Sequence, residues 1–343
     1  MVSAIVSVYN GKLFIENCIN DLINQTLYKK NLLEIIIVDS ASSDNAENII
    51  LNFQKKYKNI HYIRTAERES LYKAWNRGIK YSSGNYITNA NIDDIHRFDA
   101  LKIMFDELEN NSEIDLVYHY HYLSKIINQP YEKHINEKKI YYPEFDNRTI
   151  YQFYPFCHQN MWRKSIHEKI GFFDESYLVA GDLDFAFRFC INGHKAKLIK
   201  DFLGVQISRD DQLCVNEKSQ DEINTIIAKY FNSENFFKLY KAIGFSVETD
   251  QDKFLIIRDL FYKLLKYKLP GNENYICHYY LSAYLLVYLL QYNFDENLIN
   301  DYVNYSLNFA VVKDFYNFNE TLKKIFPEQL YNLIISKFLS NIQ

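Results

Sequence analysis

The sequence has little cysteine, proline, glycine or tryptophan. Its 343 residues include 5 Cys, 5 Pro, 9 Gly and 2 Trp. The cysteines are scattered and form no Cys-x-x-Cys pair, which argues against a disulfide framework and a structural zinc site and predicts reduced thiols in a cytoplasmic protein. The net charge of −4 predicts no nucleic-acid-binding surface. The N-terminus has no basic start like that of a signal peptide and reads directly as a strand.

Strand and helix patterns alternate up to about Cys214, and the sequence beyond is helical. Expected strands are 2–8, 34–39, 60–63, 86–90 and 115–118, and expected helices are 13–25, 44–57, 70–81, 99–109 and 182–193. This alternation predicts an α/β fold with a mostly parallel sheet. Further helices are expected at 221–231, 234–243, 252–267, 273–292, 295–308, 313–326 and 328–339. We therefore expect one domain at residues 1–213 and a helical domain or extension at 214–343.

One helical segment, residues 275–294, has no Asp, Glu, Lys or Arg. A membrane span needs about 20 predominantly apolar residues. Polar side chains and tyrosines interrupt this segment, so we favour a buried core helix. The alternative is a helix that lies on a membrane surface or binds a partner, next to Lys263, Lys266 and Lys268. Peripheral membrane association and oligomerisation through the helical region therefore stay open.

The most informative motif is Asn91-Ile92-Asp93-Asp94, which follows an apolar strand. In an open α/β sheet, ligands bind beyond the carboxyl ends of the strands. Carboxylates at that place suit a divalent cation, which prefers oxygen ligands and often also binds substrate phosphates. The alternative is an acidic loop that caps the helix expected near Asp99.

Two earlier strands also end in polar turns. The first ends in Val8-Tyr9-Asn10-Gly11 and the second in Asp39-Ser40-Ala41-Ser42-Ser43-Asp44. Asp39 can accept a hydrogen bond from a nucleobase edge, and the small residues after it let a ligand approach. Asp44 and Glu47 suit a capping-box-like helix start. The alternative for both turns is an ordinary strand–turn–helix junction.

Far downstream, Asp182 and Asp184 stand at the start of an apolar helix. Acidic side chains at a helix N-terminus are stabilised by the helix dipole, so capping alone is one interpretation. A second interpretation gives these carboxylates a chemical role.

Five segments in this order resemble family 2 glycosyltransferases, the inverting enzymes with the GT-A fold. They are Ser7–Asn10, Val38–Asp44, Leu71–Ile79, Asn91–Asp94 and Ala180–Asp182. The resemblance covers about the first two-thirds of the chain. Residues 157–163 also look like the stretch before the catalytic acid in many bacterial members. The resemblance implies transfer of a sugar from a nucleotide-diphosphate sugar, for which we expect a uridine nucleotide, in surface-glycan assembly.

The resemblance also implies roles for single residues. Asp182 matches the general base, and Asp93 matches the carboxylate that holds a divalent metal, Mn²⁺ or Mg²⁺. Asp39 matches the acid that reads the uracil ring. The other residues implied at the nucleotide-sugar site are Val8, Tyr9, Asn10, Ser42, Asn76, Arg77, Asn91 and Ile92. His158 and Asp184 match residues near the sugar or acceptor, which is a carbohydrate, a lipid-linked glycan or another hydroxyl compound.

The sequence departs from the family pattern near the metal motif. Asn91 stands where the first acid is usual, and residues 205–211 contain no histidine to help hold the metal. Arg209 could meet the phosphates instead, although we favour a solvated side chain. These departures support an alternative function as a catalytically weak nucleotide-binding partner or scaffold subunit. A nucleotidyltransferase is disfavoured because only Gly11 follows the first strand, where a glycine-rich loop is usual.

Overall fold

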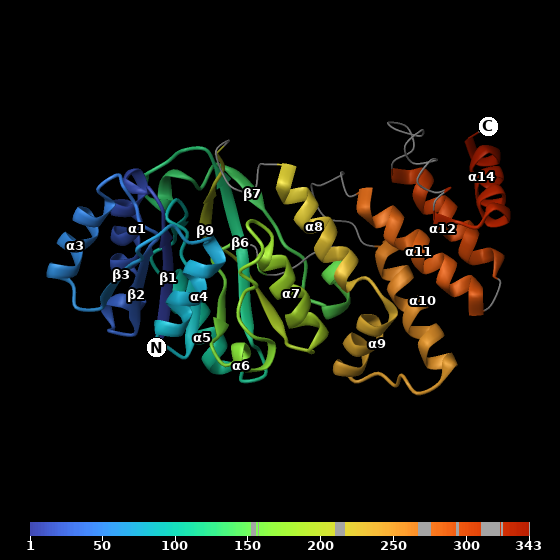
Figure 1. Ribbon diagram of the computed structural model, residues 1–343, viewed down its shortest axis with the longest axis horizontal. Helices are drawn as coiled ribbons and strands as arrows, with labels where there is room; N and C mark the ends of the chain where they lie inside the picture. The colour runs from blue at the N-terminus through green and yellow to red at the C-terminus, as the bar shows by residue number, and fades with distance from the viewer. Residues whose placement is uncertain are drawn as a thin grey trace. The chain divides into compact units, whose positions relative to one another are not determined.

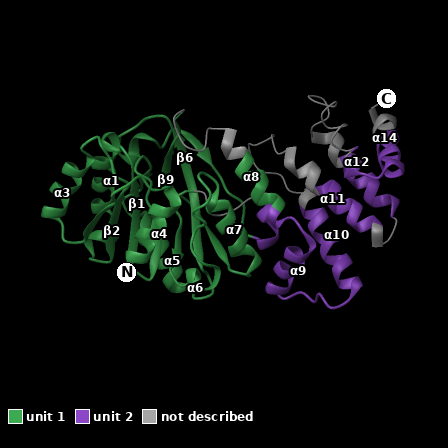
Figure 2. Cartoon of the chain, viewed as in Figure 1, with its two compact units in different colours: residues 1–145, 154–228 green, residues 146–153, 229–343 purple. Residues whose placement is uncertain are grey.

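The structure is a computed structural model of residues 1–343. It describes the chain except for residues 152–155, 157, 210–216, 267–275, 293–294, 310–322, 324 and 343. Two compact units are present, unit 1 with residues 1–145 and 154–228, and unit 2 with residues 146–153 and 229–343 (Figure 2). The domain boundary expected between residues 213 and 214 lies outside the described residues.

Unit 1 is built on one sheet with the strand order β3-β2-β1-β4-β8-β6-β9-β5, and β7 pairs with β6 (Figure 1). The strands are β1 Val2–Val8, β2 Leu33–Asp39, β3 Ile60–Arg64, β4 Tyr86–Asn89, β5 Ile95–His96, β6 Leu116–Ser124, β7 Lys138–Ile140, β8 Met161–Arg163 and β9 Ala196–Ile207. Strands β3, β2, β1 and β4 are parallel, as are β6 and β9, and the antiparallel β8 joins these two groups. The expected α/β fold with a mostly parallel sheet is confirmed.

Strand β1 shows why the central strands are buried on both faces. Its even-numbered residues pack in one core cluster with Ile15 and Leu22 of α1, Lys12–Asn24. Its Ile5 faces the opposite helix, α4, Leu71–Tyr81, because a Cβ added at Gly78 would lie 2.6 Å from the Ile5 side chain. Successive side chains of a strand point to opposite faces, so helices cover both faces of the sheet at β1.

The remaining helices of unit 1 follow the expected order with one correction at a helix start. They are α2 Thr26–Lys29, α3 Ala46–Lys56, α5 Ala100–Asn110, the 3₁₀ turn η1 Tyr131–Lys133, α6 Ile166–Ile170, α7 Gly181–Ile191 and α8 Glu217–Tyr230. The capping box expected at Asp44 and Glu47 is wrong, because Asn45 precedes the helix in a left-handed conformation with φ of 67°. The Asp44 carboxylate instead accepts hydrogen bonds from the backbone N–H groups of Ala46 and Lys12.

Every element that the structure describes in unit 2 is helical, as expected for the C-terminal region. These elements are η2 Asn147–Tyr151, α9 Ser233–Ala242, α10 Asp250–Lys266, α11 Ile276–Tyr292, α12 Glu296–Phe309 and α14 Glu328–Ile342. Most of the helix expected at 313–326 lies outside the described residues. Helix α11 buries Ala283, Leu286 and Leu289, in agreement with a core helix. Among the described residues, no helix is long and apolar enough to cross a membrane.

Candidate active site

The turns after β1 and β2 are bound to each other at the carboxyl edge of the sheet. Asn10 donates its backbone N–H to the Ser42 hydroxyl at 2.9 Å, and Ser43 donates its N–H to the Asn10 side-chain oxygen at 2.8 Å. Asn10 has a φ of 51°, a left-handed conformation that asparagine tolerates better than most residues. Two turns that are far apart in sequence therefore form one connected surface beyond the strand ends.

Asp39 lies at the end of β2, and its side chain is fully buried. Its carboxylate accepts hydrogen bonds at 2.8 Å from the Ser42 backbone N–H, the Tyr62 hydroxyl and the Arg64 guanidinium. A carboxylate has about four acceptor sites, so capacity remains for about one more donor, such as a nucleobase N–H. The proposed reading of uracil by Asp39 stays a prediction: an acceptor position is unused, but the side chain has no exposed surface in this arrangement.

Three further residues of the expected nucleotide site lie around the same turns. The Tyr9 side chain is 43% exposed, and the Arg68 guanidinium lies 4.0 Å from the centre of its ring. Val8 is buried, and its carbonyl accepts a hydrogen bond from the Ser40 N–H. Ile92 packs so closely against Gly11 that an added Cβ would lie 2.6 Å from the Ile92 side chain. The structure thus brings the Asn91–Asp94 loop against the turn after β1.

The Asn91–Asp94 loop is hydrogen-bonded within itself and to the end of β9. The Asn91 amide donates to one Asp94 oxygen at 2.9 Å, and the Ile207 backbone N–H donates to the other at 3.1 Å. Burial, and then the neighbouring Asp93, raise the pKa of Asp94 to about 8. The Asp93 carboxylate forms an ion pair with Arg209 at 3.4 Å. The solvated side chain favoured for Arg209 is wrong, since that side chain is only 25% exposed.

The residues present do not fit a divalent metal as they are arranged. Asp93 is paired with a cation, Asn91 is neutral, and both Asp94 oxygens accept hydrogen bonds. In the part of the chain that the structure describes, no group of three or more His, Cys, Asp or Glu residues could hold a metal ion. The metal expected at Asp93 therefore has no ready-made protein site.

Asp182 stands in the first turn of α7 and is oriented by α4. Its carboxylate accepts hydrogen bonds from the Leu183 N–H at 2.9 Å and from the Tyr72 hydroxyl at 3.3 Å. The Tyr72 hydroxyl also donates to the Val179 carbonyl, at the shorter distance of 2.6 Å, so its one proton is shared between the two oxygens. The Tyr72 ring packs on Gly181. Burial raises the pKa of Asp182 to about 6. This carboxylate can therefore take up and release a proton near neutral pH.

Glu222, which no motif in the sequence indicates, holds the segment before Asp182. Glu222 of α8 accepts hydrogen bonds from three successive backbone N–H groups, those of Leu178 and Val179 at 2.8 Å and of Ala180 at 2.9 Å. No local pattern indicates this contact, because the residues are 42 to 44 positions apart. Glu222 thus fixes the backbone that leads into α7.

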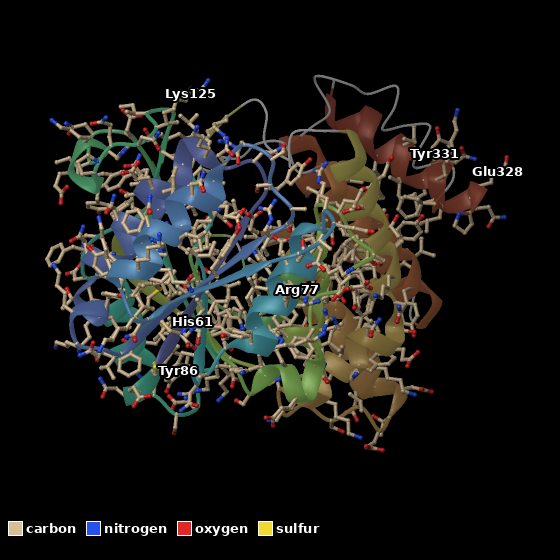
Figure 3. All side chains as sticks on the ribbon, turned by 60° about the vertical axis from the view of Figure 1, so that its left-hand side comes forward. His61, Arg77, Tyr86, Lys125, Glu328 and Tyr331 are labelled. Carbon is tan, nitrogen blue, oxygen red and sulfur yellow. The ribbon has the colours of Figure 1, made fainter. Side chains whose placement is uncertain are left out.

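Asn76 and Arg77 lie on α4 and bind other parts of the protein. The buried Asn76 amide donates to the Phe173 carbonyl at 2.8 Å and to Glu175 at 2.9 Å, and accepts from the Phe173 N–H. Arg77 projects from α4 (Figure 3), and its guanidinium donates two hydrogen bonds to the Glu69 carboxylate. The expected contact of these two residues with the nucleotide-sugar donor stays a prediction. Asn76 also links α4 to the loop that contains Phe173 and Glu175.

His158 and Asp184 lie in different environments. The His158 ring packs on His121 with 5.1 Å between ring centres, and burial lowers the pKa of His158 to about 4. Its buried Nδ1 has no hydrogen-bond partner among the described residues. Asp184 is buried and forms an ion pair with Arg188 at 2.9 Å. His158 thus keeps an unused polar atom that a ligand or water can meet, whereas Asp184 serves at least the packing of α7.

Comparisons with known proteins assign part of this chain to a family. Residues 3–171 match the family described as Glycosyl transferase family 2. The uncharacterized glycosyltransferase MJ1057 of Methanocaldococcus jannaschii is 28% identical over 204 residues, which cover 59% of this chain and 69% of that protein. Poly(ribitol-phosphate) beta-glucosyltransferase of Bacillus spizizenii is 35% identical over 117 residues, or 34% of this chain and only 18% of that protein.

Solved structures show the same fold. Residues 1–349 of S. aureus TarS, in a crystal structure with UDP-GlcNAc, align with a TM-score of 0.57 and 16% identity over 90% of this chain and 92% of that one. The complex of the same TarS segment with UDP aligns with a TM-score of 0.54 and 17% identity over 83% and 80% of the two chains. The expected GT-A type of fold is thereby confirmed. The chain carries a domain of glycosyl transferase family 2 and is a glycosyltransferase.

Proposed function

We propose that this protein is an inverting glycosyltransferase that moves a sugar from a UDP-sugar to an acceptor hydroxyl, with Asp182 as the general base. The observation that carries this proposal is the half-buried carboxylate of Asp182 in the first turn of α7, whose pKa desolvation raises to about 6. A base is most effective when its pKa lies near the working pH. Asp182 removes the proton of the acceptor hydroxyl, and the acceptor oxygen forms a bond to the anomeric carbon. The bond from that carbon to the UDP oxygen breaks at the same time, UDP leaves, and this single displacement inverts the anomeric carbon.

The proposed donor site is the connected surface formed by the turns after β1 and β2. Asp39 offers its remaining acceptor capacity to the uracil N–H, and the exposed Tyr9 ring offers a flat surface to the base. Asn10 and Ser42 hold the two turns together. Support for a uridine nucleotide comes from the TarS crystal structures, which contain UDP and UDP-GlcNAc. No step of this mechanism passes through a metal, because the residues around Asp93 do not fit one as arranged.

The proposed setting is surface-glycan assembly, with a carbohydrate or a lipid-linked glycan as the acceptor. Support comes from the similar segments of the poly(ribitol-phosphate) beta-glucosyltransferase of Bacillus spizizenii and of the minor teichoic acid biosynthesis protein GgaB of Bacillus subtilis. The chain matches only 18% and 13% of these two proteins, so their acceptors do not define this one. The free buried thiols of Cys18 and Cys190 are compatible with the cytoplasmic location that we propose.

The test is Asp182→Asn, measured both for UDP binding and for transfer from a panel of UDP-sugars. We expect kcat to fall by about 100- to 10,000-fold, because the variant cannot accept the proton, while UDP binding stays at the wild-type level. The matched control is Asp174→Asn, a change of the same size in the loop before α7, which should leave both values unchanged. Transfer by Asp182→Asn at the wild-type rate would reject the assignment.

The alternative function is a nucleotide-binding scaffold subunit. The pairing of Asp93 with Arg209 and the neutral Asn91 give it its physical support. In that case wild-type protein binds UDP, as judged by thermal shift against GDP, TDP and CDP, but no UDP-sugar is turned over.

A further inference from the structure

Arg209 is held in place on several sides. Strand β9 ends at Ile207, whose N–H is bound to Asp94, so the chain leaves the sheet directly beside the Asn91–Asp94 loop. Two residues later, the Arg209 guanidinium meets Asp93 at 3.4 Å and lies 4.4 Å from the centre of the Phe14 ring. An ion pair together with a cation–π contact fixes the side chain better than either alone. The loop at the carboxyl edge thus carries its own positive charge.

A divalent cation at Asp93 would have to compete with this arrangement. It would take carboxylate oxygens away from Arg209 and place a double positive charge beside the guanidinium. The neighbouring Asn91 adds no negative charge, and its amide nitrogen is already bound to Asp94. The loop therefore opposes the binding of a metal at the place where the family pattern expects one.

We propose that Arg209 binds the diphosphate of the nucleotide donor and supplies there the positive charge that a divalent metal would otherwise bring. A guanidinium is always charged at physiological pH, and its planar fork of N–H donors matches two phosphate oxygens at once. Asp93 then acts as the orienting partner of Arg209. This inference rests on the proposed function, because it needs a diphosphate ligand at this edge of the sheet.

The experiment is calorimetric titration of the full chain with UDP and with uridine, each in Mn²⁺ and in EDTA. We expect the UDP affinity of the wild-type protein to be the same in both conditions. In EDTA, Arg209→Gln should weaken UDP binding by about 10- to 100-fold, as for loss of hydrogen bonds to a charged group. Uridine binding should not change, because uridine has no phosphate. Arg209→Lys keeps the charge and should recover part of the UDP affinity.

The matched control is Lys169→Gln, which removes one positive charge at the other edge of the sheet. Lys169 lies on α6, which follows the antiparallel strand β8, at the end of unit 1 where the N-terminus also lies (Figure 1). This variant should bind UDP like the wild type. Wild-type UDP binding that is lost in EDTA, or an unchanged Arg209→Gln, overturns the inference and leaves the proposed function standing. No UDP binding by the wild type in either condition overturns both.

Discussion

At the scale of single residues, the carboxylates of the candidate site differ in what surrounds them. Asp39 is held by three donors, among them a guanidinium, so its geometry is fixed for recognition. Asp182 has one backbone donor and a longer bond from Tyr72, and burial raises its pKa to about 6. The proposed division of work between a reader of the base and an acceptor of protons follows from these partners.

This difference predicts the pH dependence of transfer. Asp182 must be deprotonated to act as a base, so kcat should rise with pH through about 6 and level off above it. The Tyr72 hydroxyl lowers the pKa of Asp182 by donating to its charged form. Tyr72→Phe should therefore move the acid limb of the kcat profile to higher pH, which rate measurements between pH 5 and 8 would detect.

The control for Tyr72→Phe is Tyr131→Phe, which removes a hydroxyl that donates to the Phe202 carbonyl instead. In that variant the acid limb of the kcat profile should stay at the pH of the wild-type protein. Two outcomes contradict the role of Asp182: an acid limb of the kcat profile that moves to lower pH in Tyr72→Phe, or a wild-type kcat that does not depend on pH.

Residues such as Tyr72 and Arg209 show where prediction from the sequence ends. Asp39, Asp93 and Asp182 stand in local motifs and could be selected from their position at strand and helix ends. Tyr72 contacts Asp182 across 110 positions, and Arg209 is paired with a residue of another strand end. Such contacts depend on the tertiary fold, which one sequence does not define.

At the scale of elements, the sequence predicted the first half of the sheet better than the second. Strands β1, β2 and β4 are buried on both faces and end in polar turns, and the predicted bounds of each strand lie within one residue of the observed bounds. Strand β8 has only three residues, and the pairing of β9 with β6 is shifted by irregularities near Tyr120, which obscure any period of two. Strands β8 and β9 were not predicted for that reason, and β6 was expected only at residues 115–118.

Helix α8 acts on the site through Glu222, which we regard as a positioning residue. Its carboxylate accepts from the N–H groups of Leu178, Val179 and Ala180, and a glutamine would offer only one oxygen to them. Glu222→Gln should lower kcat by about 10- to 100-fold through displacement of Asp182. UDP affinity should be unchanged, because the proposed donor turns lie on other elements. Steady-state rates and calorimetry would separate these effects.

Asp221→Asn removes the same charge from the adjacent, exposed position of α8 and serves as the control. It should leave kcat at the wild-type value. If Glu222→Gln weakened UDP binding and left kcat intact, the positioning role would be wrong.

At the scale of the whole molecule, buried histidines link the stability of unit 1 to pH. His119 and His121 on β6 lie near His158, and His167 lies on α6. Burial lowers the pKa values of His119, His158 and His167 to about 4 and that of His121 to about 2. Gln159 lies beside these histidines. A Cβ added at Gly204 would lie 1.8 Å from the Gln159 amide oxygen and 3.3 Å from the His119 ring. The sheet therefore accommodates these rings as neutral groups.

Acid should therefore unfold the protein. Below the unfolded-state pKa of about 6.5, these four histidines bind protons in the unfolded chain but stay neutral in the folded protein. Each histidine therefore lowers the free energy of unfolding by up to ~1.4 kcal/mol per pH unit. Asp94 and Asp182 oppose this, because their raised folded-state pKa values favour the folded state on acidification from about 8 and 6 respectively. Four groups outweigh two, so urea unfolding should show a net loss of stability from pH 6.5 to 4. His121→Gln should reduce that slope, and an equal or steeper slope in this variant would mean that the histidines are not its source.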